Sequence, residues 1–137
     1  MAPAPDIHWL QLAPPQQLPE QASTLLGSEV DKLFKDAQPQ PVIIAATRDD
    51  TWLAAMLLVL EPDAGAASIR QLVVTPDARG QGLGGRLLRK AIHLAREHDL
   101  PRVRSTAGFG CPDHRRMYQR LHFNDTDESP YLMARAV

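Results

Sequence analysis

The sequence predicts an α/β (α+β) fold with a mixed, mostly antiparallel twisted sheet flanked by helices. Three observations predict this class. Short apolar runs separated by turn-forming residues occupy residues 42–74, a helical repeat follows over residues 82–98, and further strand-like runs close the chain. The chain has 137 residues, which fits one domain over residues 1–137 and is enough to bury a core.

The individual elements follow from local patterns. Strands are predicted where short apolar or alternating runs are bounded by turn-forming residues. They cover residues 7–12, 42–47, 52–61, 68–74, 102–106 and 131–137, with a further short strand near Phe123. Helices are predicted where apolar residues recur at spacings of three and four. They cover residues 19–38, as one helix or two with a break at Gly27 or Ser28, and residues 82–98 and 112–121.

The composition points away from several classes of partner. The formal net charge is -1, which gives no reason to expect nucleic acid or an anionic membrane as a partner. The longest apolar run, residues 51–60, is too short to span a bilayer, and the N-terminus lacks the pattern of a signal peptide. The single cysteine, Cys111, excludes an internal disulfide and suits a reducing compartment. We therefore expect a cytoplasmic protein with no metal site.

The most informative segment, residues 72–88, runs from a predicted strand through a glycine-rich turn into an amphipathic helix. The first backbone N–H groups of a helix lack intrahelical partners, and the helix dipole adds partial positive charge there. Such an end favours an anion such as phosphate. The four glycines within residues 80–85 leave the backbone open to a pyrophosphate. Arg79 and Arg86 can add positive charge at the rim.

Other interpretations of this loop fit less well. A nucleoside triphosphate loop ends in Gly-Lys-Ser/Thr, whereas the chain reads Gly84-Gly85-Arg86. A dinucleotide fingerprint needs another glycine spacing and a parallel βαβ unit, whereas the strand before this loop belongs to a predicted antiparallel meander. A helix that merely begins with glycines remains as the structural alternative, but each glycine weakens it by about 0.5–1 kcal/mol relative to alanine.

Arg79-x-x-Gly82-x-Gly84, preceded by Leu72-Val73-Val74-Thr75-Pro76, resembles the acetyl-CoA signature of the GNAT superfamily of N-acetyltransferases. The resemblance extends from about Val42 to the C-terminus. It implies that acetyl-CoA or CoA lies between two splayed strands, those of Val73 and Val103. The residues implied for binding it are Leu72, Val73 and Val74 along the pantetheine arm, and Arg79, Gly80, Gln81, Gly82, Leu83, Gly84 and Gly85 at the pyrophosphate.

Residues 115–123 resemble the closing helix of the same family, in which a tyrosine protonates the departing thiolate of CoA. The resemblance implies that Tyr118 is a general acid, and the alternative is a tyrosine that packs on an apolar face. Two positions depart from the family pattern. Cys111 stands where asparagine is often found, and we expect it to line the CoA channel. His122 stands where glycine is usual.

The carboxylate general base of many family members is missing from both strands where it is usually placed. These stretches read Arg70-Gln71 and Arg104-Ser105-Thr106 here. The amine can lose its proton to water, or the base can be His114, Glu29 or Asp31, each of which is also explained as a solvated helix residue.

A basic concentration near the C-terminus has two interpretations, a solvated face or an anchor for the 3′-phosphate of CoA or for an acidic acceptor. Its members are Arg102, Arg104, Arg115, Arg116 and Arg120.

We therefore expect an acyltransferase that moves an acetyl group from acetyl-CoA to a primary amine by direct attack. The acceptor is a small molecule, or an amine of a peptide or protein. The alternative is a non-catalytic acetyl-CoA sensor of the same fold. The missing base and Cys111 favour the sensor, whereas the retained Tyr118 favours the enzyme. Dimerisation is common in the superfamily, so the resemblance is compatible with a homodimer.

Overall fold

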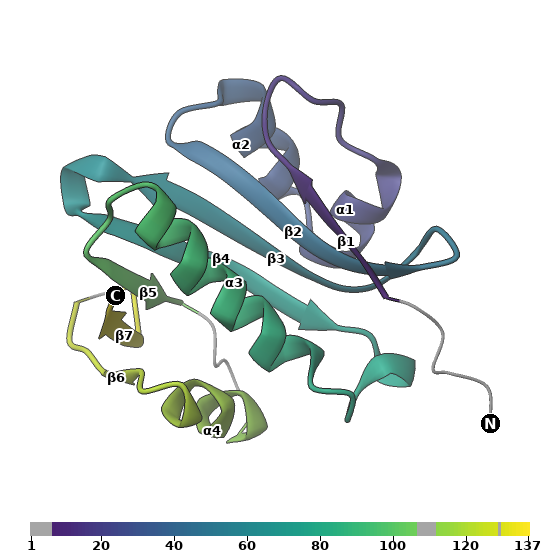
Figure 1. Cartoon of the computed structure of the whole chain (residues 1–137). Helices are drawn as coiled ribbons and strands as arrows, with labels where there is room; N and C mark the ends of the chain where they lie inside the picture. Colours follow the sequence, from purple (N-terminus) through teal and green to yellow (C-terminus); the bar gives the residue numbers. More distant parts are fainter. Residues whose placement is uncertain (1–6, 107–111, 129) are drawn as a thin grey trace.

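A single mixed sheet with helices on both faces makes up the part of the chain that the structure describes, residues 7–106, 112–128 and 130–137 of a computed structural model (Figure 1). The strands are β1 (His8–Leu12), β2 (Gln40–Arg48), β3 (Thr51–Glu61), β4 (Ala66–Val74), β5 (Arg102–Ser105), β6 (Asn124–Asp125) and β7 (Met133–Ala136). The helices are α1 (Glu20–Leu26), α2 (Glu29–Asp36), α3 (Leu83–Glu97) and α4 (Pro112–Arg120), with short 3-10 turns η1 (Pro62–Ala64) and η2 (Pro76–Ala78). Among these helices, none has the length and apolar character needed to cross a membrane.

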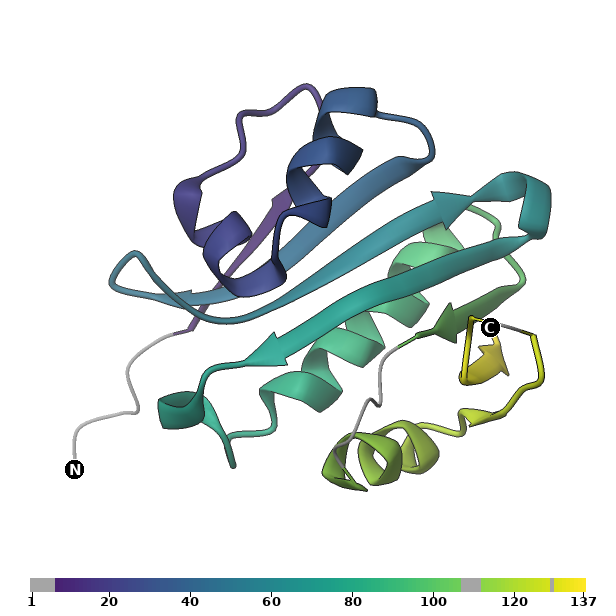
Figure 2. The same ribbon diagram turned by 180° about the vertical axis from the view of Figure 1, so that it is seen from behind.

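The strands lie in the order β1-β2-β3-β4-β5-β7-β6. Each described pair of neighbours is antiparallel except β4 and β5, which run parallel because α3 connects them as a crossover. The predicted mixed, mostly antiparallel sheet is therefore confirmed. Helices α1 and α2 cover one face, which we call the α2 face, and α3 covers the opposite α3 face (Figures 1 and 2).

Local sequence explains most element boundaries. The helical stretch of residues 19–38 is two helices, and the break falls at Gly27, whose φ of +84° suits glycine. The predicted hairpin turn has positive φ at both Asp49 and Asp50, as a tight antiparallel connection requires. The last strand begins at Met133 and not at Tyr131, because the Tyr131 amide donates to the Glu128 carbonyl in a turn.

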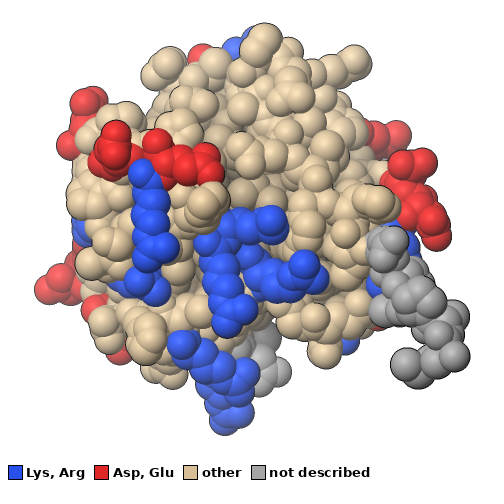
Figure 3. All heavy atoms as spheres, viewed as in Figure 1, with Lys and Arg blue, Asp and Glu red and all other residues tan. Residues whose placement is uncertain are grey.

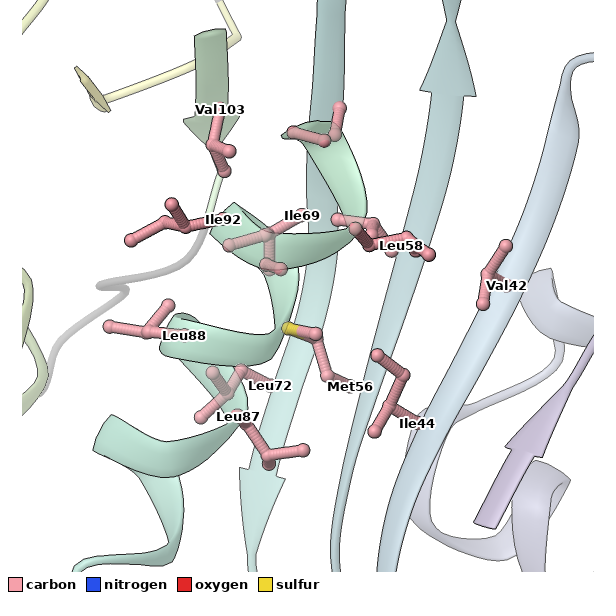
Figure 4. Close-up of a cluster of buried hydrophobic side chains, with 14 of the residues drawn as sticks. Val42, Ile44, Met56, Leu58, Ile69, Leu72, Leu87, Leu88, Ile92 and Val103 are labelled. Carbon is pink, nitrogen blue, oxygen red and sulfur yellow. The ribbon is translucent and has the colours of Figure 1, made fainter. Parts of the chain in front are cut away.

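Two buried clusters hold the layers together. On the α3 face, one side of α3 packs on the middle of β3 and β4, and Figure 4 shows Leu87 of the helix beside Leu72 and Met56 of the strands. On the α2 face, Leu26 and the other buried residues of α1 and α2 pack on β2 and β3. Each fully buried leucine contributes about 1.5–3 kcal/mol, so both clusters stabilise the sheet that positions the site.

Candidate functional site

The parallel pairing between β4 and β5 ends halfway along β4. Their ladder runs from Ala66↔Arg102 to Ile69↔Ser105, whereas β4 continues to Val74. Among the described residues, only the amide and hydroxyl of Thr106 extend the contact, to the carbonyls of Ile69 and Arg70. Residues 70–74 thus lack a β5 partner along one edge within the described chain. We call this stretch the β4–β5 gap, and its closed end at Ile69 and Ser105 the apex.

A bulge in β4 lies at the apex. The register of β3 against β4 shifts between Leu57 and Leu58, which pair with Gln71 and Ile69, so Arg70 is the extra residue. A bulge of this kind bends its strand and redirects side chains. It is consistent with β4 turning away from β5 at this point.

The glycine-rich loop lies beyond the open end of the gap. Gly80 and Gly82 have φ of +84° and +74°, a left-handed backbone that other residues adopt at a cost. Gly82 is the N-cap residue of α3 and provides no side-chain hydrogen bond to it. The first amides of α3, beginning at Leu83, are therefore left for another acceptor.

The two glycines in the first turn of α3 have different surroundings. A Cβ on Gly84 would come within 2.6 Å of the Met117 sulfur, so this glycine allows α4 to approach α3. A Cβ on Gly85 would meet no described atom within 4 Å. Gly84 thus has a structural explanation, whereas Gly85 leaves open space beside the helix N-terminus.

The strand residues predicted to border the cofactor contribute their side chains to both layers. Leu72 is buried on the α3 face, and the half-buried Val74 packs against the same cluster. Val73 packs against the cluster on the α2 face. Leu83 is buried in the core and anchors the loop. Because these side chains are engaged in packing, the backbone edge is what β4 presents to the gap.

The polar loop residues have their own contacts. Arg79 is exposed, and its Nε donates to the Val74 carbonyl at 3.4 Å. Gln81 is exposed and accepts a hydrogen bond from Arg48 at 3.4 Å, which connects the loop to the end of β2. The guanidinium of Arg86 lies 4.9 Å from the ring centre of Trp9, so it leans toward β1.

The face over α3 and α4 is basic. Figure 3 shows Lys and Arg side chains gathered there, in the same view as Figure 1. Exposed arginines in the first half of α3 contribute to it, namely Arg86 and Arg89. A positive surface around a helix N-terminus attracts polyanions such as the phosphates of CoA.

Tyr118 reaches the apex from α4. Its side chain is fully buried, and its hydroxyl lies 2.8 Å from the Ser105 hydroxyl at the end of β5. Its ring meets the Phe123 ring edge to face, with centres 5.1 Å apart. Burial raises the pKa of Tyr118 well above its ordinary value, which outweighs the opposing effect of the Ser105 hydrogen bond. Tyr118 therefore keeps its proton at neutral pH.

The candidate bases are distributed around the site. Glu29 lies on the α2 face with its carboxylate 3.5 Å from the Arg70 guanidinium. Asp31 accepts a hydrogen bond from Ser23 at 2.9 Å and so has a structural role between α1 and α2. His114 is half-buried on α4. Cys111 lies outside the described residues.

A buried ionic cluster on the α2 face was not predicted from the sequence. Arg104 is buried, donates to Ser68 at 2.8 Å, and pairs with Glu61 and Glu128. Arg102 binds both oxygens of Glu128, at 2.6 and 2.8 Å. These partners are remote in sequence, so no local pattern marks them.

The five arginines noted near the C-terminus in the sequence fall into separate groups in the structure. Arg102 and Arg104 are neutralised by Glu61 and Glu128, while Arg115 belongs to α4 and pairs with Asp125. The five arginines are therefore not one anion site. Arg116 and Arg120 of α4 remain exposed.

The comparisons with known proteins agree with this geometry. A family model described as the Acetyltransferase (GNAT) family matches residues 5–123. A search of curated protein sequences gave no match.

Solved structures share the fold at low identity. An IAA acetyltransferase from Bacillus cereus ATCC 14579 superposes with a TM-score of 0.73 and 14% identity, covering 96% of this chain and 100% of that one. A GNAT family acetyltransferase from Elizabethkingia anophelis with acetyl-CoA bound gives 0.74 and 16%, over 96% and 98%. The ribosomal-protein-S18-alanine N-acetyltransferase from Escherichia coli gives 0.71 and 16%, over 95% and 94%. With a family model that spans most of its length, the chain belongs to the GNAT family of acetyltransferases.

Proposed function

We propose that the chain, acting as one domain, transfers an acetyl group from acetyl-CoA to a primary amine. The observation that carries the proposal is the β4–β5 gap, with an open helix N-terminus at one end and the Tyr118–Ser105 hydroxyl pair at the other. A pyrophosphate at the first turn of α3 leaves an extended arm to run back along the backbone of residues 74 to 71. Four residues of strand span about 13 Å, which brings the thioester to the apex.

The proposed reaction is direct. The amine nitrogen attacks the thioester carbonyl, a C–N bond forms, the C–S bond breaks, and the thiolate leaves. As the general acid, Tyr118 donates its hydroxyl hydrogen bond to the departing sulfur, and the proton lost by the amine is released to solvent. Ser105 is proposed as a positioning residue, because a hydroxyl that donates to Tyr118 leaves the phenol proton free to point at the sulfur.

The buried state of Tyr118 limits what it can do. Because its pKa lies above that of a thiol, about 8.5, complete proton transfer to a thiolate is uphill. Its main contribution is then a hydrogen bond that stabilises negative charge as it develops on sulfur. No Asp or Glu occurs at residues 70–71 or 104–106, and the nearby Glu29 is paired with Arg70, which supports loss of the amine proton to water.

The test is calorimetric titration with acetyl-CoA and with CoA, followed by an amine panel assayed for thiol release. We expect binding of both, and thiol release that depends on an amine. Binding without turnover on any amine would favour the non-catalytic sensor. A protein that bound neither compound would exclude both functions.

A further inference from the structure

We propose that Arg70 selects acceptors whose amine carries a carboxylate a few bonds away, as in a free amino acid. This inference rests on the proposed function, because it concerns the acceptor side of the same site. It starts from the bulge, which puts Arg70 at the apex, next to Ile69 and its partner Ser105.

At the apex, Tyr118 and Arg70 lie on opposite faces of the sheet. Tyr118 reaches Ser105 from α4 and belongs to the buried cluster on the α3 face. The Arg70 side chain projects to the α2 face, where it meets Glu29. An amine approaching the thioester from the side opposite Tyr118 therefore passes Arg70, since the acid and the nucleophile act on different parts of the thioester.

Arg70 has fewer strong partners than the other arginines of this face. Arg102 and Arg104 are bound by short or buried contacts to Glu128 and Glu61. Among the described residues, Arg70 makes one ion pair, of 3.5 Å, with a Glu29 side chain that is 43% exposed, and its charge also acts on Glu61. Such exposed pairs contribute little to stability, because solvent screens them.

The Arg70 guanidinium can therefore exchange partners. Its side chain is 29% exposed, and its Nε is buried with no hydrogen-bond acceptor among the described residues. A guanidinium binds a carboxylate through two parallel hydrogen bonds, which are stronger than neutral ones. A ligand carboxylate that displaced Glu29 would thus gain more than the lost contact contributed, and its amine would be held near the apex.

The test compares matched acceptors that differ only in carboxylate against carboxamide, such as leucine and leucinamide or phenylalanine and phenylalaninamide. For each pair we expect a ratio of kcat/KM, acid over amide, that falls about 10–100-fold in Arg70→Gln, chiefly through KM for the acid. The acid and the amide differ in the basicity of their amines, but this difference is the same for every variant, so it cancels when the ratios of two variants are compared. Arg70→Lys should keep part of the preference, and Glu29→Gln should keep or increase it because a competing carboxylate is removed.

The matched control is Arg96→Gln, which removes an exposed guanidinium from α3. It should leave the ratio unchanged. A ratio that is the same in wild type, Arg70→Gln and Glu29→Gln would overturn the inference.

A second readout does not depend on turnover. Titration of leucine into the protein saturated with CoA should show binding that Arg70→Gln abolishes and that leucinamide lacks. Binding of this kind without turnover would contradict the proposed enzyme and leave the role of Arg70 intact. Equal turnover of amides and acids, with no Arg70-dependent binding, would support the proposed enzyme and contradict the role of Arg70.

Discussion

The Tyr118 hydroxyl lies 2.8 Å from the Ser105 hydroxyl, in a buried contact that joins α4 to the end of β5. This contact falls at the one position where the parallel ladder of β4 and β5 stops. The hydroxyl of Tyr118 is positioned by the packing of α4 and lies at the end of the gap, and a hydroxyl that accepts a hydrogen bond can still donate one.

Replacing Tyr118 by phenylalanine should separate catalysis from packing. The ring contact with Phe123 is retained, so we expect acetyl-CoA affinity within about twofold of wild type. Thiol release should fall about 100-fold, at the low end of what a positioned acid contributes. The measurements are steady-state thiol release and calorimetric titration.

Variants of Ser105 provide the control for that experiment. Ser105→Ala leaves the Tyr118 hydroxyl without this partner and should lower turnover by a smaller factor, whereas Ser105→Thr retains a hydroxyl and should recover part of it. If Tyr118→Phe turned over at the wild-type rate and only its stability fell, Tyr118 would be a packing residue.

Gly85 and Gly84 should respond to alanine in opposite ways. A Cβ on Gly85 meets open space, so Gly85→Ala should stabilise the free protein by about 0.5–1 kcal/mol through helix propensity. The same methyl would lie where a pyrophosphate is proposed to approach, and loss of a charged hydrogen bond corresponds to about 10–100-fold weaker CoA binding. Thermal denaturation and titration with CoA measure the two effects.

The comparison with Gly84→Ala tests the structural explanation. Here the methyl would crowd the Met117 sulfur, and we expect a loss of about 1 kcal/mol that Met117→Ala partly relieves. If Gly85→Ala bound CoA as tightly as wild type, the proposed position of the pyrophosphate beside Gly85 would be wrong.

The glycine loop could be predicted from the sequence because its causes are local. Positive φ at Gly80 and Gly82 and the helical period of α3 are properties of neighbouring residues. The same holds for the break at Gly27 between α1 and α2.

The apex could be predicted only in part. The bulge at Arg70 was not predicted, although its trace is in the sequence: two polar residues, Arg70 and Gln71, separate Ile69 from Leu72, which both lie on the α3 face. The cluster around Arg104 left no such signal, because Glu61 and Glu128 come to it from positions 43 and 24 residues away. Pairings of that kind follow from the tertiary structure alone.

His122 should be a site where glycine stabilises the protein. It follows α4 with φ of +68°, and the amides of His122 and Phe123 donate to the carbonyls of Gln119 and Tyr118, which is the Schellman motif. Glycine favours this left-handed position, and the His122 side chain is exposed, so little packing is lost. We expect His122→Gly to raise stability by up to about 1 kcal/mol. His122→Asn should give a smaller gain, and a lower Tm for the glycine variant would contradict the motif.

The stability of the protein should depend on the ionisation of Glu128. Hydrogen bonds from Arg102, together with the charges of both arginines, outweigh burial and lower the pKa of Glu128 from 4.5 to about 2. A carboxyl with a depressed folded pKa stabilises the fold above its unfolded pKa, and that contribution is lost as the pH falls from about 4.5 toward 2. Glu128→Gln should therefore have a lower Tm than wild type at pH 7, and the difference should shrink as the pH falls through this range.

The matched control for Glu128→Gln is Asp127→Asn, which removes the neighbouring carboxylate from an exposed side chain. It should change Tm little at pH 7, because the effect expected for Glu128 comes from its two arginine partners and not from net charge. Carboxyls outside the cluster are common to wild type and Glu128→Gln, so the difference in Tm between these two proteins isolates the cluster of Glu128, Arg102, Arg104 and Glu61. If that difference stayed constant from pH 7 to pH 2, the charge of Glu128 would contribute nothing to folding through Arg102 and Arg104. Among the described contacts, the Leu132 amide bond to Ser105 and the stacking of Tyr131 on Arg104 would then be the ones that hold residues 131–132 beside β5.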